Sequence, residues 1–384
     1  MSRTDFLPVS TRLKGHSACV QGVIECNPGR FISWSDDLRI ALWDSVTGHL
    51  LSELDVDWPE ISGVLRLSDA HVLIWGPYDK HQLILDTRFG KVVARWAQGV
   101  AGLNSLQMLG NGTVLSTCQD GVLRIHDAIS GVCHASREGV MHARALTDGR
   151  IAGWNMGGTV VRVWDEELFE RIAVLGMASH TLSGIELLGH GQWLATWGAA
   201  HDVLVWDLDT SACVAQLTGH RETTHEERYM FQPIQGVKPL DADSVISWAA
   251  DETLRVWDLA NASTRHVLHA HESPVLGAMV TPDKKIVSWA MEPVMQIWDT
   301  KTGEHLGSLH GHESTVLDAF VLKSGHWLSH STDETLRLWD ADTGRCEAVL
   351  KGHEDYIHGV LELSNGKLVS WAENGSLLMW TLDD

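Results

Sequence analysis

A segment that ends in Trp-Asp recurs along this chain of 384 residues. It reads FISWSDDLRIALWD at residues 31–44, VISWAADETLRVWD at 245–258, IVSWAMEPVMQIWD at 286–299 and WLSHSTDETLRLWD at 327–340. Aligned on the Trp position, nine copies can be counted, at Trp43, Leu85, His126, Trp164, Trp206, Trp257, Trp298, Trp339 and Trp380. Their spacings are 42, 41, 38, 42, 51, 41, 41 and 41 residues. A period of about 41 residues predicts one four-stranded β unit per repeat.

The strands of one unit can be predicted from residues 311–353. Apolar residues alternate with polar ones over 316–322, 327–331 and 336–339, which indicates three half-buried strands separated by short polar turns. A fourth strand is expected at 346–350, before the next Gly-His pair. Each unit is therefore predicted to be a four-stranded antiparallel meander.

The repeats resemble the WD40-repeat family, because Gly-His opens a unit, Ser-x-Asp lies in its middle and Trp-Asp ends it. The Gly-His pairs are Gly15-His16, Gly219-His220, Gly311-His312 and Gly352-His353, with Ala270-His271 as a near copy. The distance from His to Trp is 27 residues in four copies, those that begin at His16, His271, His312 and His353. The resemblance extends over nearly the whole chain.

The resemblance implies a buried hydrogen-bond relay in which His, Ser, Asp and Trp of one blade are linked. Two blades keep all four residues, namely His16, Ser35, Asp37 and Trp43, and His312, Ser331, Asp333 and Trp339. In other repeats Ala249, Ala290 and Ala372 replace the Ser, while Glu292 and Asn374 replace the Asp. Those blades are expected to depend more on apolar packing than on this hydrogen-bond relay.

The fold class is therefore predicted to be all-β, a single closed β-propeller of four-stranded antiparallel blades. Nine blades are favoured, with seven or eight as alternatives. The segment 9–14 resembles a fourth strand, whereas the last repeat ends after its third, so the N-terminal strand is expected to complete the last blade. The predicted organisation is an N-terminal tail over 1–8 and a nine-repeat propeller over 9–384.

Composition limits the partners and the environment. A formal charge of −21 disfavours nucleic acid and anionic membranes and favours basic partners. We find no apolar stretch of about 18 residues and no secretion signal, so a cytoplasmic protein without a membrane segment is expected. The six cysteines form no Cys-x-x-Cys pair and are expected to be free and mostly buried thiols.

The one long repeat contains an insertion over residues 221–230. The resemblance places this loop on the face of the propeller that commonly receives partners, and loops carry function disproportionately. Its predicted partner-binding residues are Arg221, His225, Glu226, Arg228 and Tyr229. No metal site is predicted, although His220, His225 and Glu226 could imitate one; a harmless solvated insertion is the alternative.

The same face offers further candidates at the starts of the first strands and before the turn Asp. These positions are Gln21, Asp36, Glu60, Tyr78, Gln119, Met141, Met291, Leu317, Tyr356, His358 and Glu373. Such a mixed apolar, aromatic and acidic surface suits a peptide or a basic segment. The alternative for Tyr78, Met141 and Met291 is packing against neighbouring blades.

No catalytic motif is found, whether a zinc-protease helix, a nucleophile elbow, a phosphate loop or a dinucleotide fingerprint. The prediction is a non-catalytic scaffold without a cofactor, a monomer or a subunit of a complex, that binds a protein or peptide. The alternatives are a propeller that binds a small ligand or metal in its channel, and a structural subunit of a larger assembly.

A second set of Trp residues lies one strand before the repeat Trp. Its members are Trp34, Trp197, Trp248, Trp289 and Trp371, with Trp75 and Trp154 within one residue of register. Trp34 must point away from Ser35, since side chains alternate along a strand. These Trp side chains are predicted to fill the space between adjacent blades.

Overall fold

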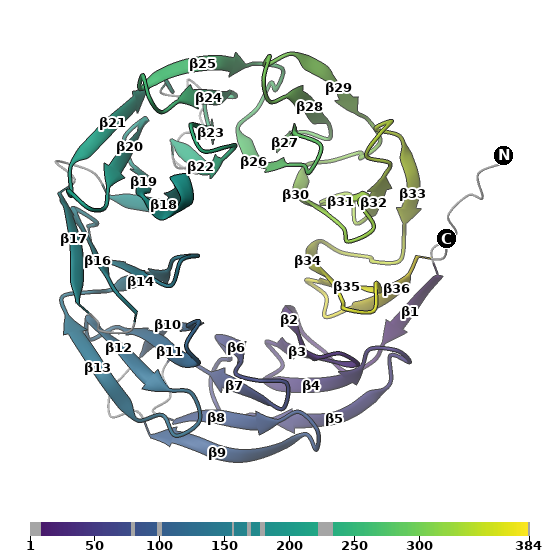
Figure 1. The fold of residues 1–384 in the computed structure, drawn as a ribbon. Helices are drawn as coiled ribbons and strands as arrows, with labels where there is room; N and C mark the ends of the chain where they lie inside the picture. The colour runs from purple at the N-terminus through teal and green to yellow at the C-terminus, as the bar shows by residue number, and fades with distance from the viewer. Residues whose placement is uncertain are drawn as a thin grey trace. The chain divides into compact units, whose positions relative to one another are not determined.

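The computed structural model describes residues 9–77, 81–97, 102–155, 157–166, 170–176, 181–221 and 233–382. Within these ranges the chain forms nine four-stranded antiparallel sheets, the blades of a β-propeller, with one short 3₁₀ helix, η1 (Gly189–Gly191) (Figure 1). No helix in the described ranges has the length and hydropathy that crossing a bilayer requires. The predicted fold class and number of blades are confirmed.

The first three blades follow one another along the chain. Blade 1 is β2 (Val20–Asn27), β3 (Arg30–Ser35), β4 (Arg39–Asp44) and β5 (Leu50–Asp55). Blade 2 is β6 (Gly63–Arg66), β7 (His71–Trp75), β8 (His81–Asp86) and β9 (Lys91–Ala97). Blade 3 is β10 (Leu103–Met108), β11 (Thr113–Cys118), β12 (Val122–Asp127) and β13 (Cys133–Glu138).

The next three blades repeat the same order of strands. Blade 4 is β14 (His142–Ala145), β15 (Ile151–Trp154), β16 (Val160–Trp164) and β17 (Arg171–Gly176). Blade 5 is β18 (Leu182–Leu188), β19 (Trp193–Gly198), β20 (Asp202–Asp207) and β21 (Cys213–Thr218). Blade 6 is β22 (Ile234–Pro239), β23 (Ser244–Ala249), β24 (Leu254–Asp258) and β25 (Ser263–Leu268).

The last three blades bring the two ends of the chain into one sheet. Blade 7 is β26 (Val275–Val280), β27 (Lys285–Ala290), β28 (Met295–Asp299) and β29 (His305–Leu309). Blade 8 is β30 (Val316–Val321), β31 (Trp327–Ser331), β32 (Leu336–Trp339) and β33 (Cys346–Leu350). Blade 9 is β34 (Ile357–Glu362), β35 (Leu368–Ala372), β36 (Leu377–Thr381) and β1 (Val9–Leu13).

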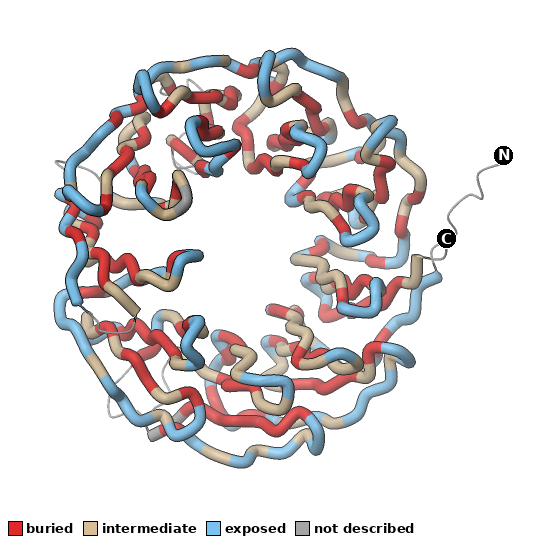
Figure 2. The backbone as a smooth tube through the Cα atoms, in the orientation of Figure 1, coloured by how far each residue is buried: buried red, intermediate tan, exposed pale blue. Residues whose placement is uncertain are grey.

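Contacts divide the chain into two compact units. Unit 1 comprises residues 1–143, 334–338 and 347–384, and unit 2 comprises 144–333 and 339–346. In both units the second and third strands of a blade are mostly buried, as in β3 and β23, whereas the fourth strand is largely exposed, as in β5 (Figure 2). The buried apolar side chains are therefore concentrated in the middle strands, while fourth strands also carry exposed apolar residues such as Leu50 and Leu51 of β5.

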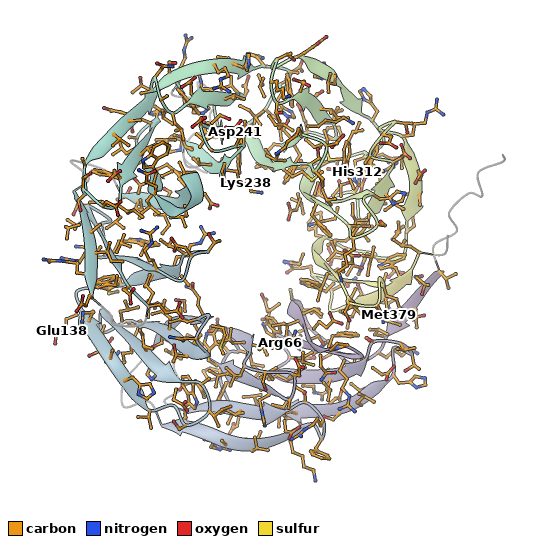
Figure 3. All side chains as sticks on the ribbon, viewed as in Figure 1. Arg66, Glu138, Lys238, Asp241, His312 and Met379 are labelled. Atoms are coloured by element: carbon orange, nitrogen blue, oxygen red, sulfur yellow. The ribbon has the colours of Figure 1, made fainter. Side chains whose placement is uncertain are left out.

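The N-terminal strand completes blade 9, as predicted. β1 pairs antiparallel with β36, from Val9 opposite Thr381 to Leu13 opposite Leu377. The predicted 9–14 strand is thus one residue shorter in the structure. Leu13 is buried and belongs to one apolar cluster with Met379 of β36, which is labelled in Figure 3.

The hydrogen-bond relay is present, but its serine is not the predicted one. In blade 1 the indole N–H of Trp43 donates to Ser33 Oγ at 2.8 Å, and Ser33 Oγ lies 2.7 Å from His16 Nε2. His16 Nδ1 lies 3.2 Å from the Asp37 carboxylate. Ser35 instead donates to the Ala18 carbonyl. The assignment of Ser35 to the relay was wrong by two residues.

Three blades that were predicted to depend more on apolar packing than on the relay retain its His-Ser-Trp part. The Ser that links His and Trp is Ser247 in blade 6, Ser288 in blade 7 and Ser370 in blade 9. In blade 8 it is Ser329 rather than Ser331, with His312 labelled in Figure 3. The second ring nitrogen of His271 contacts Glu292, and that of His353 contacts Ser376 rather than Asn374. The replacement of Ser by Ala at 249, 290 and 372 therefore leaves the relay intact.

The second set of Trp residues fills the space between neighbouring blades, as predicted. Within unit 2, Trp248 Nε1–H donates to the Leu276 carbonyl of blade 7 at 3.2 Å. Trp289 Nε1–H donates to the Leu317 carbonyl of blade 8 at the same distance. In unit 1, Trp34 packs against the blade 2 cluster that contains Val64. Each of these indoles thus spans two consecutive blades.

A glycine lies opposite most of these indoles, a feature that the sequence analysis did not identify. The cross-strand pairs are Gly22–Trp34, Gly63–Trp75, Gly184–Trp197, Gly236–Trp248, Gly277–Trp289 and Gly359–Trp371. A Cβ atom at Gly277 would lie 2.2 Å from Trp289 Cζ2, well inside van der Waals contact. The first strand needs Gly there because the ring occupies the place of a side chain.

Replacing Gly277 with alanine is expected to destabilise the protein by about 1–3 kcal/mol, the usual cost of overpacking a core. The ring cannot move away freely, because its N–H is bonded to blade 8. The control is Gly176→Ala at the end of β17, where a Cβ would meet no atom within 4 Å. Neither glycine has a positive φ, so backbone strain does not enter. Equal denaturant midpoints for the two variants would contradict this account.

Candidate functional site

A β-bulge opens most blades and presents one extra side chain. In seven of the described blades, the register between the first and second strands shifts by one residue. The extra residues are Gln21, Asn104, Ser183, Gln235, Leu276, Leu317 and His358. Bulges redirect side chains and are frequent beside functional sites. Three predicted partner residues, Gln21, Leu317 and His358, occupy this position.

A second set of predicted residues begins the turn after the second strand. The backbone N–H of Asp36 donates to the Cys19 carbonyl at 3.0 Å, and that of Glu373 donates to the Tyr356 carbonyl at 3.0 Å. Gln119 and Met291 make the equivalent bonds to Gly102 and Pro274. These predicted partner residues come from different repeats but occupy the same structural position, since each begins a turn beside the bulge of its own blade.

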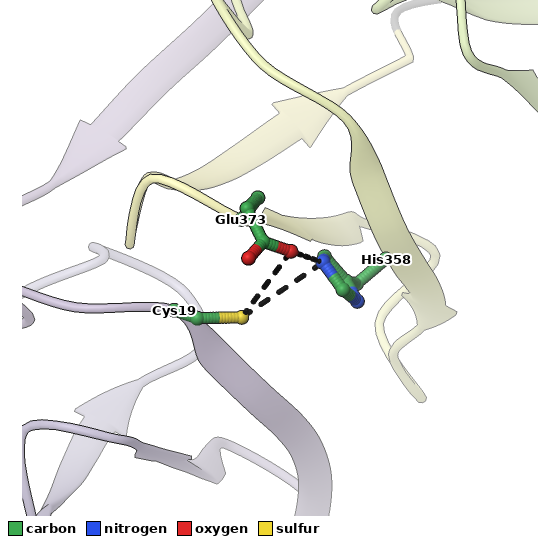
Figure 4. A group of neighbouring side chains, drawn as sticks. All are labelled: Cys19, His358 and Glu373. Atoms are coloured by element: carbon green, nitrogen blue, oxygen red, sulfur yellow. Dashed lines mark hydrogen bonds and ion pairs between the residues drawn. The ribbon is translucent and has the colours of Figure 1, made fainter.

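In unit 1 the bulge and turn residues of blades 1 and 9 come together around Cys19. Cys19 Sγ lies 3.8 Å from His358 Nε2 and 3.9 Å from Glu373 Oε2, and His358 Nε2 contacts Glu373 Oε2 directly (Figure 4). Gln21 Nε2–H donates to the Asp36 carboxylate at 2.9 Å and lies 3.7 Å from Cys19 Sγ. We call Cys19, Gln21, Asp36, Asp355, Tyr356, His358 and Glu373 the blade 9/1 cluster.

The blade 9/1 cluster is acidic and open to solvent. Burial, together with the carboxylates of Glu373, Asp36 and Asp355, raises the pKa of the Cys19 thiol to about 11. The thiol is therefore protonated at neutral pH, and the negative charge of the site lies on the three carboxylates. Tyr356 is 55% exposed beside them, so its ring is accessible to a partner. Such a surface attracts cations and can stack against a partner.

The other predicted positions lie elsewhere. Gln119 and Glu60 are exposed, Met291 is half-buried, and Leu317 is 37% exposed in unit 2. Met141 is half-buried, and its backbone carbonyl accepts a hydrogen bond from Asn104 of blade 3. Arg221 is exposed, and its backbone N–H donates to Asp251.

Several predicted residues lie outside the described residues. They are Tyr78 and the insertion residues His225, Glu226, Arg228 and Tyr229. The partner-binding role of the 221–230 loop stays a prediction.

Sequence reasoning missed two members of the cluster, Cys19 and Asp355. Cys19 was grouped with the other cysteines, which were expected to be mostly buried. All six thiols are free, but only Cys26 and Cys118 are buried. Cys19 and His358 are 339 residues apart, so no local motif could join them. The available signal was the predicted completion of the last blade by the N-terminal strand, which makes blades 9 and 1 neighbours.

No family model matches this sequence. Autophagy-related protein 16 from Arabidopsis thaliana is 24% identical over 277 residues, which cover 70% of this chain and 53% of that protein. Nuclear distribution protein PAC1-2 from Uncinocarpus reesii is 28% identical over 281 residues, covering 62% of this chain and 59% of that protein. The chain thus matches only a little over half the length of these relatives.

Among solved structures, the computationally designed Ika8 protein is similar in fold. It aligns with a TM-score of 0.61 and 21% identity over 97% of this chain and 98% of that one. With the nine four-stranded blades, this likeness defines the class of protein as a β-propeller. The repeat motifs, the His-Ser-Trp relays and the sequence relatives place the chain in the WD40-repeat β-propeller family.

Proposed function

We propose that this protein is a non-catalytic interaction scaffold that binds a basic protein segment at the blade 9/1 cluster. The observation that carries the proposal is the convergence of Asp36, Asp355 and Glu373 on one surface beside exposed Tyr356. Carboxylates complement Lys and Arg side chains, and Tyr is a favoured anchor in interfaces. The net charge of −21 on the whole chain also favours a basic partner.

The architecture of the site supports binding rather than chemistry. Two of the carboxylates, those of Asp36 and Glu373, are held on tight turns in which the Asp36 N–H donates to the Cys19 carbonyl and the Glu373 N–H donates to the Tyr356 carbonyl. A preorganised surface loses little conformational freedom when a peptide binds. The thiol of Cys19, whose pKa is raised to about 11, is a weak nucleophile because little thiolate forms at neutral pH.

The test is binding of fluorescent Arg/Lys-rich peptides, followed by anisotropy in the presence of a chelator. The triple variant Asp36→Asn/Asp355→Asn/Tyr356→Ala is expected to bind at least about tenfold more weakly than wild type, equivalent to about 1.4 kcal/mol. Wild-type affinity should also fall as salt is raised, because exposed charges are screened.

The matched control removes the same number of negative charges, two, and one aromatic ring at positions outside the cluster. It is Asp209→Asn/Asp342→Asn/Phe89→Ala, three exposed positions outside the cluster. This variant is expected to bind like wild type. Equal weakening in both triple variants would mean that overall charge acts rather than this surface, and the proposal would then be wrong.

A further inference from the structure

The blade 9/1 cluster also contains a set of metal-ligating atoms. Cys19 Sγ, His358 Nε2 and one oxygen of Glu373 all lie within 4.8 Å of one another. A tetrahedral zinc ion holds sulfur at about 2.3 Å and nitrogen or oxygen at about 2.0–2.2 Å, which places a sulfur ligand about 3.6 Å from the other two. The observed separations from sulfur, 3.8 and 3.9 Å, are close to this value.

We propose that Cys19, His358 and Glu373 bind one divalent metal ion of the zinc class, linking blade 9 to blade 1. The inference goes beyond the proposed function and does not depend on it. The mixture of thiolate, imidazole and carboxylate suits zinc, whereas magnesium and calcium prefer oxygen ligands alone. The fourth position would be open to water or to a partner's side chain.

The three ligands are positioned by the ends of strands. Cys19 directly precedes β2, His358 is the bulge residue of β34, and Glu373 directly follows β35. The backbone around two of them is fixed, since the Cys19 carbonyl accepts the Asp36 N–H and the Glu373 N–H donates to Tyr356. The side chains of His358 and Glu373 are 40% and 55% exposed, so they can separate by the short distance that coordination requires.

Binding exchanges protons and hydrogen bonds for metal bonds. The Cys19 thiol releases its proton to solvent as the sulfur–metal bond forms. The hydrogen bond between His358 and Glu373 breaks. The imidazole loses its Nε2 proton to solvent and takes one up at Nδ1, so that Nε2 and the Glu373 carboxylate both present lone pairs to the metal. The Gln21 amide, 3.7 Å from Cys19 Sγ, can then donate to the thiolate while it keeps Asp36 in place. Hydrogen bonds of this kind commonly change metal affinity about 10–100-fold.

The test titrates the full chain, stripped with a chelator, with zinc and with cobalt. One equivalent of either ion is expected to bind, and the cobalt form should show the charge-transfer absorption of a sulfur ligand and the strong visible bands of a tetrahedral site. Cys19→Ser should abolish the charge-transfer band and weaken zinc binding at least about tenfold. His358→Gln and Glu373→Gln should weaken zinc binding and keep that band at saturating cobalt.

The controls are Cys133→Ser and Cys213→Ser, two exposed cysteines outside the cluster. Both should bind zinc and cobalt like wild type, and circular dichroism checks that every variant is folded. Zinc should raise the unfolding midpoint of wild type and of these controls but not that of Cys19→Ser. Absence of the cobalt–sulfur band, or binding that Cys19→Ser leaves unchanged, would overturn the proposal. Because peptide binding is measured with chelator, a failed metal site leaves the proposed function standing.

Discussion

Ser33→Ala is expected to lower the free energy of unfolding by about 3 kcal/mol, although it removes one oxygen atom. The Ser33 hydroxyl accepts the Trp43 indole N–H and bonds to His16 Nε2, and all three side chains are buried. Each buried polar group left without a partner costs about 1–3 kcal/mol, and this variant leaves two. Asp37 stays bonded to His16 Nδ1, so the ring cannot turn to find a new partner without losing that contact.

The control for Ser33→Ala lies two residues along the same strand. Ser35→Ala removes a hydroxyl of equal burial, which donates to the Ala18 carbonyl and accepts the Asp37 N–H. Its expected cost is about 1 kcal/mol, that of an ordinary hydrogen bond. Blades 6, 7 and 9 already have Ala at this position. The measurement is equilibrium unfolding by denaturant, repeated with Ser329→Ala and Ser331→Ala in blade 8; equal costs within each pair would show that the relay serine is misassigned.

The mistaken serine shows where sequence reasoning reaches its limit. Ser33 and Ser35 lie on the same side of β3 because side chains alternate, so hydrophobic pattern and burial cannot separate them. The pairing of β3 with β4 distinguishes the two serines. Trp43 lies opposite Phe31, which makes Ser33 its diagonal neighbour, while Ser35 is four residues from Phe31, about 13 Å along the strand.

Repetition made the fold predictable and also hid the packing between blades. The 41-residue period favoured nine blades over seven or eight, and the unmatched segments at the two ends indicated the strand that completes blade 9. The Trp in the second strand was visible, but its Gly partner lies in another strand, where Gly277 opposes Trp289 in the register that runs from the turn between β26 and β27. The pair becomes visible only when the two strands are aligned across their turn, because register decides which residues of neighbouring strands face each other.

The candidate site was predictable in position but not in chemistry. Gln21, Asp36, Tyr356, His358 and Glu373 were all chosen from the sequence, and the structure brings them together because blades 1 and 9 are neighbours in unit 1. The role of Cys19 depends on distances of 3.8 and 3.9 Å between residues more than 330 positions apart. Side-chain distances of this kind follow from packing, which no spacing motif encodes.

Removing residues 1–13, and with them β1, is expected to have the largest effect on stability. β1 forms five cross-strand pairs with β36, and its last residue, Leu13, is buried against Met379. About one hydrogen bond per pair at about 1 kcal/mol each, with the burial of one Leu at about 2 kcal/mol, suggests a loss of up to about 7 kcal/mol. The loss also leaves the backbone groups of β36 unpaired along one edge, and such edges pair with other chains.

The experiment compares this truncation with a shorter one that removes only residues 1–8 and keeps β1. The longer truncation should lower the thermal unfolding midpoint markedly and associate in a concentration-dependent way in light scattering, while the shorter one behaves like the full chain. A synthetic peptide of residues 9–14, added in excess, should partly restore the midpoint, because it can occupy the free edge of β36. Because Cys19 lies between the deleted segment and β2, zinc binding should weaken in parallel with the midpoint. If both truncations unfold alike, the pairing of β1 with β36 contributes little, and blade 9 is held by its other three strands.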